Sequence, residues 1–421
     1  MFANTLTLRA IERLVGLERQ RLVVAIALCV VSSSCASTGS SRHLADALAV
    51  KTRPQDLAAS PQLLARLLGS AHGYFRFVNV PFSQSVCERF QNALPELPAV
   101  NLHGDAHVEQ YAVTSLGRGL TDFDDSSTGP FVIDLVRFGV SLELASRERG
   151  WRRHEAAVLD AFFRGYRAAL DDPAFVAPEP ALVARLRSTF TGDHSARLHQ
   201  GEQLMGSDTD PSSLLRLAAA EYVSGLLAAH PELPDHFFEI KRSGVLRIGI
   251  GSALDLKFLV RIEGPTKADD DDLLLEAKEV KDISMISCVN APPGAGRVLA
   301  GHSRIANQPF LFAGFLRAEG VTLWVHAWPD DYVEVATRTF ESPRELVELA
   351  LDAGAQLGRG APRALPDGKK RPLRREILAA FDRHEWQIRK EIGAFTTATV
   401  EAWQRFRLRS GDLAPRQTRG P

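Results

Sequence analysis

Apolar residues recur at intervals of three and four along most of the chain, which predicts that helices dominate it. The segments with this spacing are 61–68, 131–147, 214–229, 295–306, 343–358 and 371–408. Shorter runs have the character of strands. These runs are 99–102, 120–123, 245–251, 256–263, 273–280, 310–317 and 321–336. The predicted fold class is therefore α+β, with a tight turn at residues 251–255 joining the strands 245–251 and 256–263.

The N-terminal residues have the features of an export leader. Arginines precede an apolar run at 22–31, which as a helix spans about 15 Å, half of a bilayer's hydrocarbon core. The run therefore fits a signal peptide better than a transmembrane helix. Small residues lead into Cys35 as in a bacterial lipobox, although Ser32 stands where Leu or Val is usual. We expect export to the cell envelope, with Cys35 as a lipid anchor to the membrane. A frayed N-terminal helix is the alternative, and an unprocessed leader would leave the protein cytoplasmic.

These patterns suggest five divisions of the chain. The predicted divisions are a leader at 1–35, a Ser/Gly-rich tether at 36–55, a mainly helical region at 56–240, a β-rich region at 241–340 and C-terminal helices at 341–421. The helical region carries most of the candidate chemistry.

Composition narrows the functional classes. The 421 residues are 45% hydrophobic and 24% charged, as in an ordinary globular protein. With 50 basic and 51 acidic side chains, the net charge of −1 argues against nucleic acid as a partner. Only nine of the basic residues are Lys, so a Lys in a motif stands out. Beyond the leader, Cys87 and Cys288 are too few for a disulfide framework and too far apart for a zinc pattern.

Two polar clusters follow predicted strands. The first contains His103, Asp105 and His107, and the second contains Asp122, Asp124 and Asp125. Clustered carboxylates repel one another unless a cation or a proton-accepting role compensates. Phosphoryl transfer needs this combination, because one Asp orients an acceptor hydroxyl while another holds the magnesium that bridges the phosphates. A solvated acidic loop and a zinc site on the first cluster are the alternatives.

The same residues carry a family resemblance. The run His103-Gly-Asp-Ala-His-Val-Glu-Gln110 resembles the catalytic loop HGDxHxxN of the aminoglycoside phosphotransferase and choline kinase branch of the protein-kinase-like superfamily. Thr121-Asp-Phe-Asp-Asp125 resembles that branch's metal-binding strand. A closer resemblance is to a bacterial family, domain of unknown function 2252, with the motifs GDAHxxNFG, NDFDE, GPxxxDLxRL, GxGSxG and KEA. The corresponding segments here are Gly104–Tyr111, Thr121–Asp125, Gly129–Phe138, Gly249–Leu254 and Lys278–Val280.

The resemblance implies a two-lobed, protein-kinase-like fold that binds ATP and Mg²⁺. It gives catalytic positions to Asp105, as the base, and to His103 and His107 in the same loop. It assigns metal binding to Asp122, Asp124 and Gln110. It assigns phosphate binding to Gly249, Gly251, Ser252, Lys278 and Arg304. An ordinary hairpin, an exposed strand lysine and a solvated helix face are the plainer interpretations of this last group. Asp134 and Arg137 are expected to contact the catalytic loop, and a surface helix pair is their alternative.

Two departures from the family pattern matter for function. The glycine-rich turn and Lys278 follow the catalytic loop, whereas kinase-like proteins place them before it, so the order of the nucleotide-lobe strands is expected to be permuted. Gln110 replaces an Asn, which lengthens the amide by one methylene. The expected function is phosphoryl or nucleotidyl transfer from Mg-ATP to an unknown small molecule or protein. A non-catalytic, exported ligand-binding module is the second hypothesis, and a metal-dependent hydrolase is the third.

Overall fold

The computed structural model describes residues 42–52, 57, 60–205, 212–246, 250, 255–318, 320–365 and 373–410. Of the described residues, 53% are helical and 15% are in strands, which confirms the α+β class. The leader, most of the tether and the glycine-rich turn at 249–252, apart from Ile250, lie outside the described residues. No helix in the described part of the chain is both long and apolar enough to cross a membrane.

The α-helices are α3 (Pro61–Gly69), α4 (Ala71–Phe77), α5 (Asn79–Arg89), α6 (Val132–Glu148), α7 (Glu155–Asp171), α8 (Ala181–Arg187), α9 (His194–Leu204), α10 (Ser212–Ala229), α11 (Gly296–Ile305), α12 (Pro343–Gly360) and α13 (Leu373–Ser410). The strands are β1 (Ala99–Leu102), β2 (Tyr111–Thr114), β3 (Arg118–Leu120), β4 (Ser127–Pro130), β5 (Ile240–Val245), β6 (Lys257–Ile262), β7 (Leu273–Glu279), β8 (Gly314–Ala318), β9 (Val321–Ala327) and β10 (Tyr332–Glu334).

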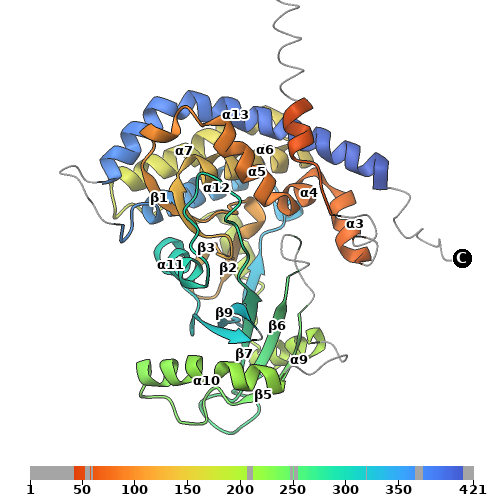
Figure 1. Cartoon of the computed structure of the whole chain (residues 1–421), viewed down its shortest axis with the longest axis vertical. Coiled ribbons are helices and arrows are strands. Elements are labelled where there is room, and N and C mark those ends of the chain that lie inside the picture. The colour runs from red at the N-terminus through yellow and green to blue at the C-terminus, as the bar shows by residue number, and fades with distance from the viewer. Residues whose placement is uncertain are drawn as a thin grey trace, which may run out of the picture.

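Most helices gather in one layer, drawn at the top of Figure 1, around a large apolar core. Within it α6 is almost entirely buried, with α13 and α7 packed against it. Close packing of α7 and α12 depends on Gly165, Gly354 and Gly358. A Cβ atom on any of these would collide with a backbone carbonyl of the neighbouring helix, so only glycine fits there.

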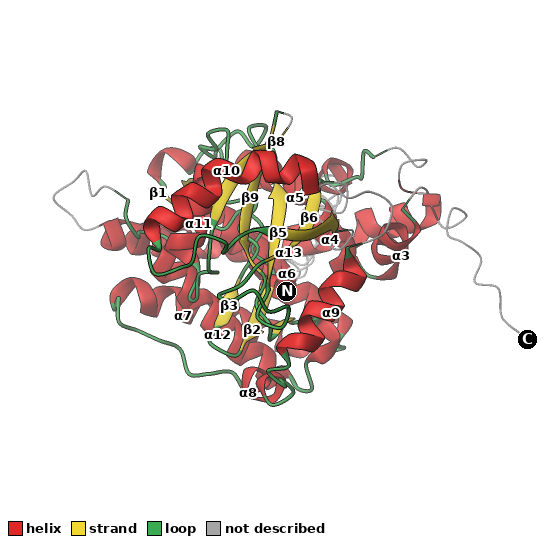
Figure 2. Ribbon diagram, turned by 90° about the horizontal axis from the view of Figure 1, so that it is seen from below, coloured by secondary structure: helices red, strands yellow, loops and turns green. Residues whose placement is uncertain are grey.

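The larger sheet lies below this layer in Figure 1 and is antiparallel throughout, in the order β5-β6-β7-β9-β8. Its strands alternate in the usual way, so each contributes to both faces. One face packs its apolar residues under α10, which crosses the sheet in Figure 2. The other face packs Leu259 and Leu274 against Leu198 of α9. Beyond this contact the second face is polar and turns toward the helical layer. We call its residues Lys257, Glu276, Lys278, Trp324 and His326 the polar sheet face.

Two smaller sheets hold the polar loops. Strand β1 pairs with β4, and β2 lies between β10 and β3. The predicted strand at 120–123 is wrong, because β3 ends at Leu120 and Asp122 has a φ of 62°, which a continuing strand does not allow. The predicted strand at 245–251 is displaced, because β5 begins at Ile240 and ends at Val245, opposite Phe258. The predicted turn at 251–255, apart from Asp255, lies outside the described residues.

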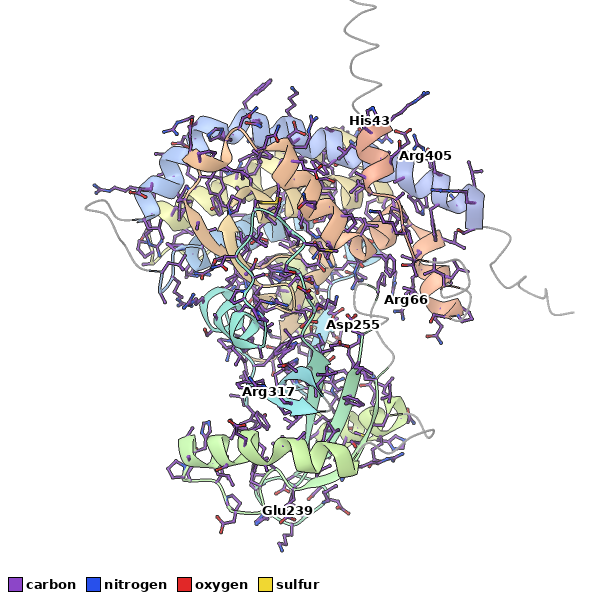
Figure 3. The ribbon with its side chains drawn as sticks, viewed as in Figure 1. His43, Arg66, Glu239, Asp255, Arg317 and Arg405 are labelled. Carbon is purple, nitrogen blue, oxygen red and sulfur yellow. A yellow bond between two sulfur atoms is a disulfide. The ribbon has the colours of Figure 1, made fainter. Side chains whose placement is uncertain are left out.

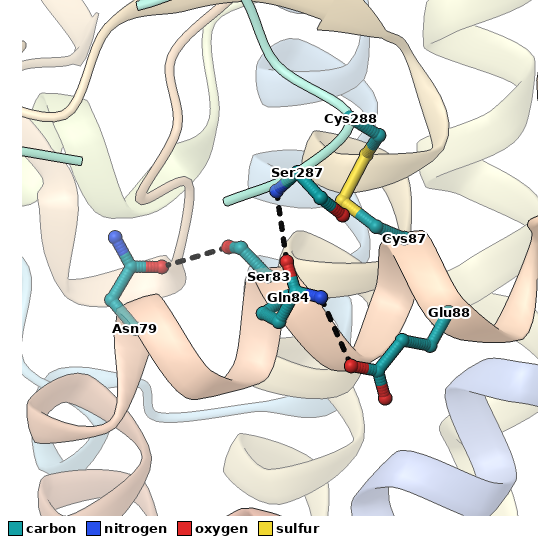
Figure 4. Close-up of a disulfide and its surroundings, with 7 residues drawn as sticks. All are labelled: Asn79, Ser83, Gln84, Cys87, Glu88, Ser287 and Cys288. Atoms are coloured by element: carbon teal, nitrogen blue, oxygen red, sulfur yellow. Dashed lines mark hydrogen bonds between the residues drawn. A yellow bond between two sulfur atoms is a disulfide. The ribbon is translucent and has the colours of Figure 1, made fainter. Parts of the chain in front are cut away.

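Cys87 and Cys288 form a disulfide, with Cα atoms 5.6 Å apart. It joins α5 to the segment between β7 and α11 (Figure 4). Beside it, the backbone N–H of Ser287 donates to Gln84 Oε1 at 2.8 Å. The two cysteines are too few for a framework, as expected, yet they still form one covalent link across 201 residues of sequence.

Candidate functional site

A cavity of about 560 Å³ lies between the helical layer and the polar sheet face. Its lining joins residues that are far apart in the sequence. From the loops come Asp105, His107, Gln110, Asp122, Asp124 and Asp125, and from the sheet come Lys257, Glu276, Lys278 and His326. Arg66 of α3, labelled in Figure 3, also lines the cavity. The two acidic segments and Lys278, identified separately in the sequence, therefore share one site.

The loop after β1 is held by helix α6. Asp134 accepts hydrogen bonds from the backbone N–H groups of His103, at 2.7 Å, and Gly104, at 2.9 Å. Gly104 has a φ of 83°, and a Cβ atom there would collide with the carbonyl oxygen of Asp125. This position therefore requires glycine. Both the turn and its anchor are buried, so Asp134 belongs to the loop's support and not to a surface helix pair.

Asp105 is fixed by an ion pair inside the protein. Arg137 is fully buried, and its Nε lies 2.6 Å from Asp105 Oδ1. The guanidinium also lies over the ring of Phe75, 4.2 Å from its centroid. Burial raises the pKa of Asp105 to about 6, against the lowering effect of Arg137. A carboxyl group with this pKa titrates near neutrality, as a general base does.

The two histidines of the loop differ in their surroundings. His103 Nε2 lies 2.8 Å from the carbonyl oxygen of Thr121, and its Nδ1 accepts from the N–H of Asp105 at 3.3 Å. Both of its ring nitrogens therefore have backbone partners. His107 Nε2 lies 3.8 Å from Asp105 Oδ2, and burial lowers the pKa of His107 well below its usual value. His107 is thus a neutral neighbour of Asp105.

Asp122 is the point where the loops meet the sheet. Its Oδ1 lies 2.7 Å from Lys278 Nζ, and its Oδ2 accepts from Gln110 Nε2 at 3.0 Å. Burial alone would raise the pKa of Asp122, but Lys278 and the hydrogen bonds hold it well below the usual value. The pKa of Lys278 is raised well above its usual value, because the nearby carboxylates outweigh the effect of burial.

Asp124 lies beside this pair in a more acidic environment. It accepts from Trp324 Nε1 at 2.6 Å, and its Oδ2 lies 3.6 Å from Lys278 Nζ. Burial, and then the charge of Asp122, raise the pKa of Asp124 to about 8. Trp324 is fully buried, and its indole N–H orients this carboxyl group. The buried Asp124 and the partly exposed Asp122 share one lysine, which leaves room for a further positive charge.

The donor set fits magnesium chemically. Asp122, Asp124 and Gln110 present oxygen atoms, which hard cations such as Mg²⁺ prefer, and Mg²⁺ usually binds one or two carboxylates together with substrate phosphates. Among the described residues, no group of three or more His, Cys, Asp or Glu side chains is arranged to hold a metal ion by itself. Glu276, on the same strand face, has its Oε1 3.8 Å from Lys278 Nζ, whereas Glu279 accepts from the N–H of Leu256.

Among the cations at or next to this site, sequence reasoning did not single out Lys257, Lys281 or Arg297. Lys257 and Lys281 line the cavity. Arg297 of α11 donates to the carbonyl oxygens of Asp124, at 2.6 Å, and Lys281, at 2.5 Å, and so fastens the acidic loop to the end of β7. The scarcity of lysine was a usable signal for Lys257 and Lys281. No sequence signal pointed to Arg297, because its hydrogen-bond acceptors are backbone carbonyl oxygens.

Some expected phosphate contacts are not part of this site. Arg304 does not line the cavity, and its Nη1 donates to Asn101 Oδ1 at 3.1 Å. Gly249, Gly251 and Ser252 lie outside the described residues, although Ile250 between them lines the cavity. Two aromatic residues, Trp328 and Tyr332, also line the cavity.

Comparison with known proteins gives one match. Residues 55–179 match the model of a family described as "Uncharacterized protein conserved in bacteria (DUF2252)". The match covers the loop of Asp105, the acidic segment at 121–125 and helix α6, and it ends before the sheet that carries Lys278. No curated protein and no solved structure matches the chain significantly.

Proposed function

We propose that this protein is a kinase-like phosphotransferase that uses Mg-ATP. The main observation that supports this proposal is the contact of Lys278 Nζ with Asp122 Oδ1, at 2.7 Å, in a cavity that Asp105 and Asp124 also line. Phosphoryl transfer depends on a positioned base, carboxylates for the metal and a lysine for the phosphates. These three groups come here from three separate segments of the chain.

Each group has an assigned role in this proposal. Asp105, held by Arg137, accepts the proton of the acceptor hydroxyl, and its pKa of about 6 suits that role near neutral pH. Asp122 and Asp124, with Gln110, hold Mg²⁺, which when bound neutralises charge on the phosphates. Lys278 binds the phosphates. When Mg-ATP enters, the ion pair between Lys278 and Asp122 is exchanged for contacts of both residues with the ligand.

The same groups serve nucleotidyl transfer, in which the acceptor attacks a different phosphorus atom. The position that the acceptor takes along the phosphate chain decides which of the two reactions occurs. The proposed acceptor is a small molecule or a protein. Product analysis with ATP labelled at the α- or the γ-phosphate separates them.

A second function is favoured by specific observations. Gln110 replaces the usual Asn and its amide donates to Asp122, while Lys278 takes up the other oxygen of that carboxylate. The Cys87–Cys288 disulfide is typical of an oxidising compartment, where nucleoside triphosphates are scarce. A non-catalytic, exported ligand-binding module would show both features. We do not retain the hydrolase hypothesis, because both ring nitrogens of His103 have backbone partners.

Thermal unfolding tests the phosphotransferase proposal. Saturating Mg-ATP is expected to raise the Tm of the protein by several degrees compared with Mg²⁺ alone, because a ligand that binds only the folded state stabilises it. Asp122→Ala should lose this shift. Asp270→Ala, in an exposed loop away from the cavity, should retain it.

The outcomes of this experiment differ for each hypothesis. If no nucleotide shifts the Tm of the unmodified protein, the phosphotransferase proposal is wrong. A shift by Mg-ATP without formation of ADP or pyrophosphate, in the presence of diverse acceptors, would favour the ligand-binding module.

We propose export, with Cys35 as the lipid-attachment site. The apolar run before Cys35 and the disulfide support this localisation together. In a bacterial host the full chain is expected in the membrane fraction, and Cys35→Ser is expected to move it to the soluble fraction of the envelope. Ser37→Ala serves as the matched control. Equal partitioning of the Cys35→Ser chain and the unmodified chain would show that Cys35 carries no lipid.

A further inference from the structure

Two lysines face each other across neighbouring strands of the polar sheet face. Lys257 of β6 is directly opposite Lys278 of β7 in the antiparallel register. The two residues are only 3% and 8% exposed, and both line the cavity. Residues in this relation have Cβ atoms about 4.5–5.5 Å apart, so the two side chains leave neighbouring strands side by side on one face of the sheet.

Two physical effects act against this arrangement, and the neighbouring carboxylates Glu276, Asp122 and Asp124 offset part of them. Like charges directly opposite each other destabilise a strand pair, and burial adds a desolvation cost. The carboxylates of Asp122, Asp124 and Glu276 lie 2.7, 3.6 and 3.8 Å from Lys278 Nζ. Burial, and then the charge of Lys278, lower the pKa of Lys257, which agrees with this cost. An anion that enters the cavity would reduce the repulsion.

A third lysine, Lys281, lines the cavity close to the end of β7. It has an ion pair with Asp255 at 3.1 Å. Three of the chain's nine lysines therefore converge on one site. A single phosphate or carboxylate is compact and satisfies one or two such groups. A chain of linked phosphates carries several negative charges along its length and matches a row of cations.

We infer that Lys257 is a second phosphate-binding residue, and that the cavity recognises a polyphosphate chain of at least two linked phosphates. This inference deepens the proposed function and rests on the same site. In the kinase-like pattern one lysine binds the phosphates. Here Lys257 and Lys278 together bind adjacent phosphates, so affinity should increase with the number of phosphates.

Calorimetric titration of the full chain with inorganic phosphates tests this inference. Without Mg²⁺, tripolyphosphate is expected to bind more tightly than pyrophosphate, and orthophosphate most weakly. Lys257→Met, which keeps the length of the side chain but removes the charge, should weaken tripolyphosphate binding by about tenfold or more, as expected for a lost charged hydrogen bond. Orthophosphate binding should change less.

Two further variants control for folding and for general charge. Lys257→Arg restores the charge and should recover most of the tripolyphosphate affinity. Lys267→Met removes a lysine from an exposed loop and should leave the affinity unchanged. If Lys257→Met fails to fold, its Tm will show this, and Lys257→Arg against Lys267→Met then provides the comparison. In that comparison, Lys257→Arg should also keep the preference for longer phosphate chains.

Failure of this inference differs from failure of the proposed function. Equal affinities of the folded Lys257→Met and unmodified chains for tripolyphosphate, or equal affinities for one and three phosphates, would overturn the role of Lys257. Tight, Lys257-dependent binding of tripolyphosphate by a chain that transfers nothing from Mg-ATP to any acceptor would uphold the inference and contradict the phosphotransferase.

Discussion

Arg137→Met is expected to lower the free energy of unfolding by about 3–5 kcal/mol at pH 8, because it leaves the buried carboxylate of Asp105 without its cation. Methionine retains much of the volume and can still contact the ring of Phe75. The loss of unfolding free energy therefore reflects mainly the removal of the positive charge of Arg137. Denaturant unfolding of the variant and the unmodified chain, measured in parallel, gives the difference.

The pH dependence of the stability difference between the Arg137→Met variant and the unmodified chain shows whether the charge of Asp105 causes it. The pKa of Asp105 is raised from 3.8 to about 6 in the folded protein, so its carboxyl group reduces stability as pH rises between these values. Arg137 lowers that pKa, and its removal raises it further. The deficit of the variant should therefore be larger at pH 8 than at pH 5, where Asp105 is protonated.

A double variant provides the control. Asp105→Asn combined with Arg137→Met removes both charges and should recover much of the stability lost at pH 8. A deficit that is the same at pH 5 and pH 8, and is not recovered in the double variant, would show that packing and not charge determines the role of Arg137.

Replacing both Cys87 and Cys288 by Ser is expected to lower the free energy of unfolding by about 2–5 kcal/mol. The disulfide closes a loop across 201 residues, and a closed loop restricts the unfolded chain. It also attaches to α5 the segment that follows Lys281, so we expect weaker binding of Mg-ATP as well as lower stability.

Reduction provides the matched test for the disulfide. Dithiothreitol should lower the Tm of the unmodified chain toward that of the double-serine variant, and should leave that variant unchanged. Thiol titration of unfolded protein counts the cysteines that remain free. If the unmodified chain keeps its Tm under full reduction, the link contributes little to folding.

The candidate site was predictable where its residues are close in the sequence. The loop of His103 and Asp105 follows a strand, and the helix that carries Asp134 and Arg137 begins soon after the acidic segment. Asp134 then binds the backbone of the loop, and Arg137 binds Asp105. Local spacing placed these residues on one helix, and the family pattern supplied the expectation that they contact the loop.

The partners of Lys278 were less predictable. Its strand and face followed from alternation, and Glu276 on the same face does lie near it. Its closest contact, Asp122, is 156 residues away in sequence, and the resemblance alone suggested that both serve one ligand. The pairing of Lys257 with Lys278 required the register of β6 against β7, which depends on the connection between strands and on packing under α10.

The sequence by itself determined the α+β class and most helices, and it singled out the two acidic segments and Lys278 as candidates for the site. Periodicity and short motifs carry this information, because they depend on neighbours along the chain. Only the tertiary structure decided that the polar sheet face meets the acidic loops, that Lys257 and Lys281 join Lys278, and that Cys87 reaches Cys288. Those contacts arise from how helices and sheet pack, and packing is a property of the whole chain.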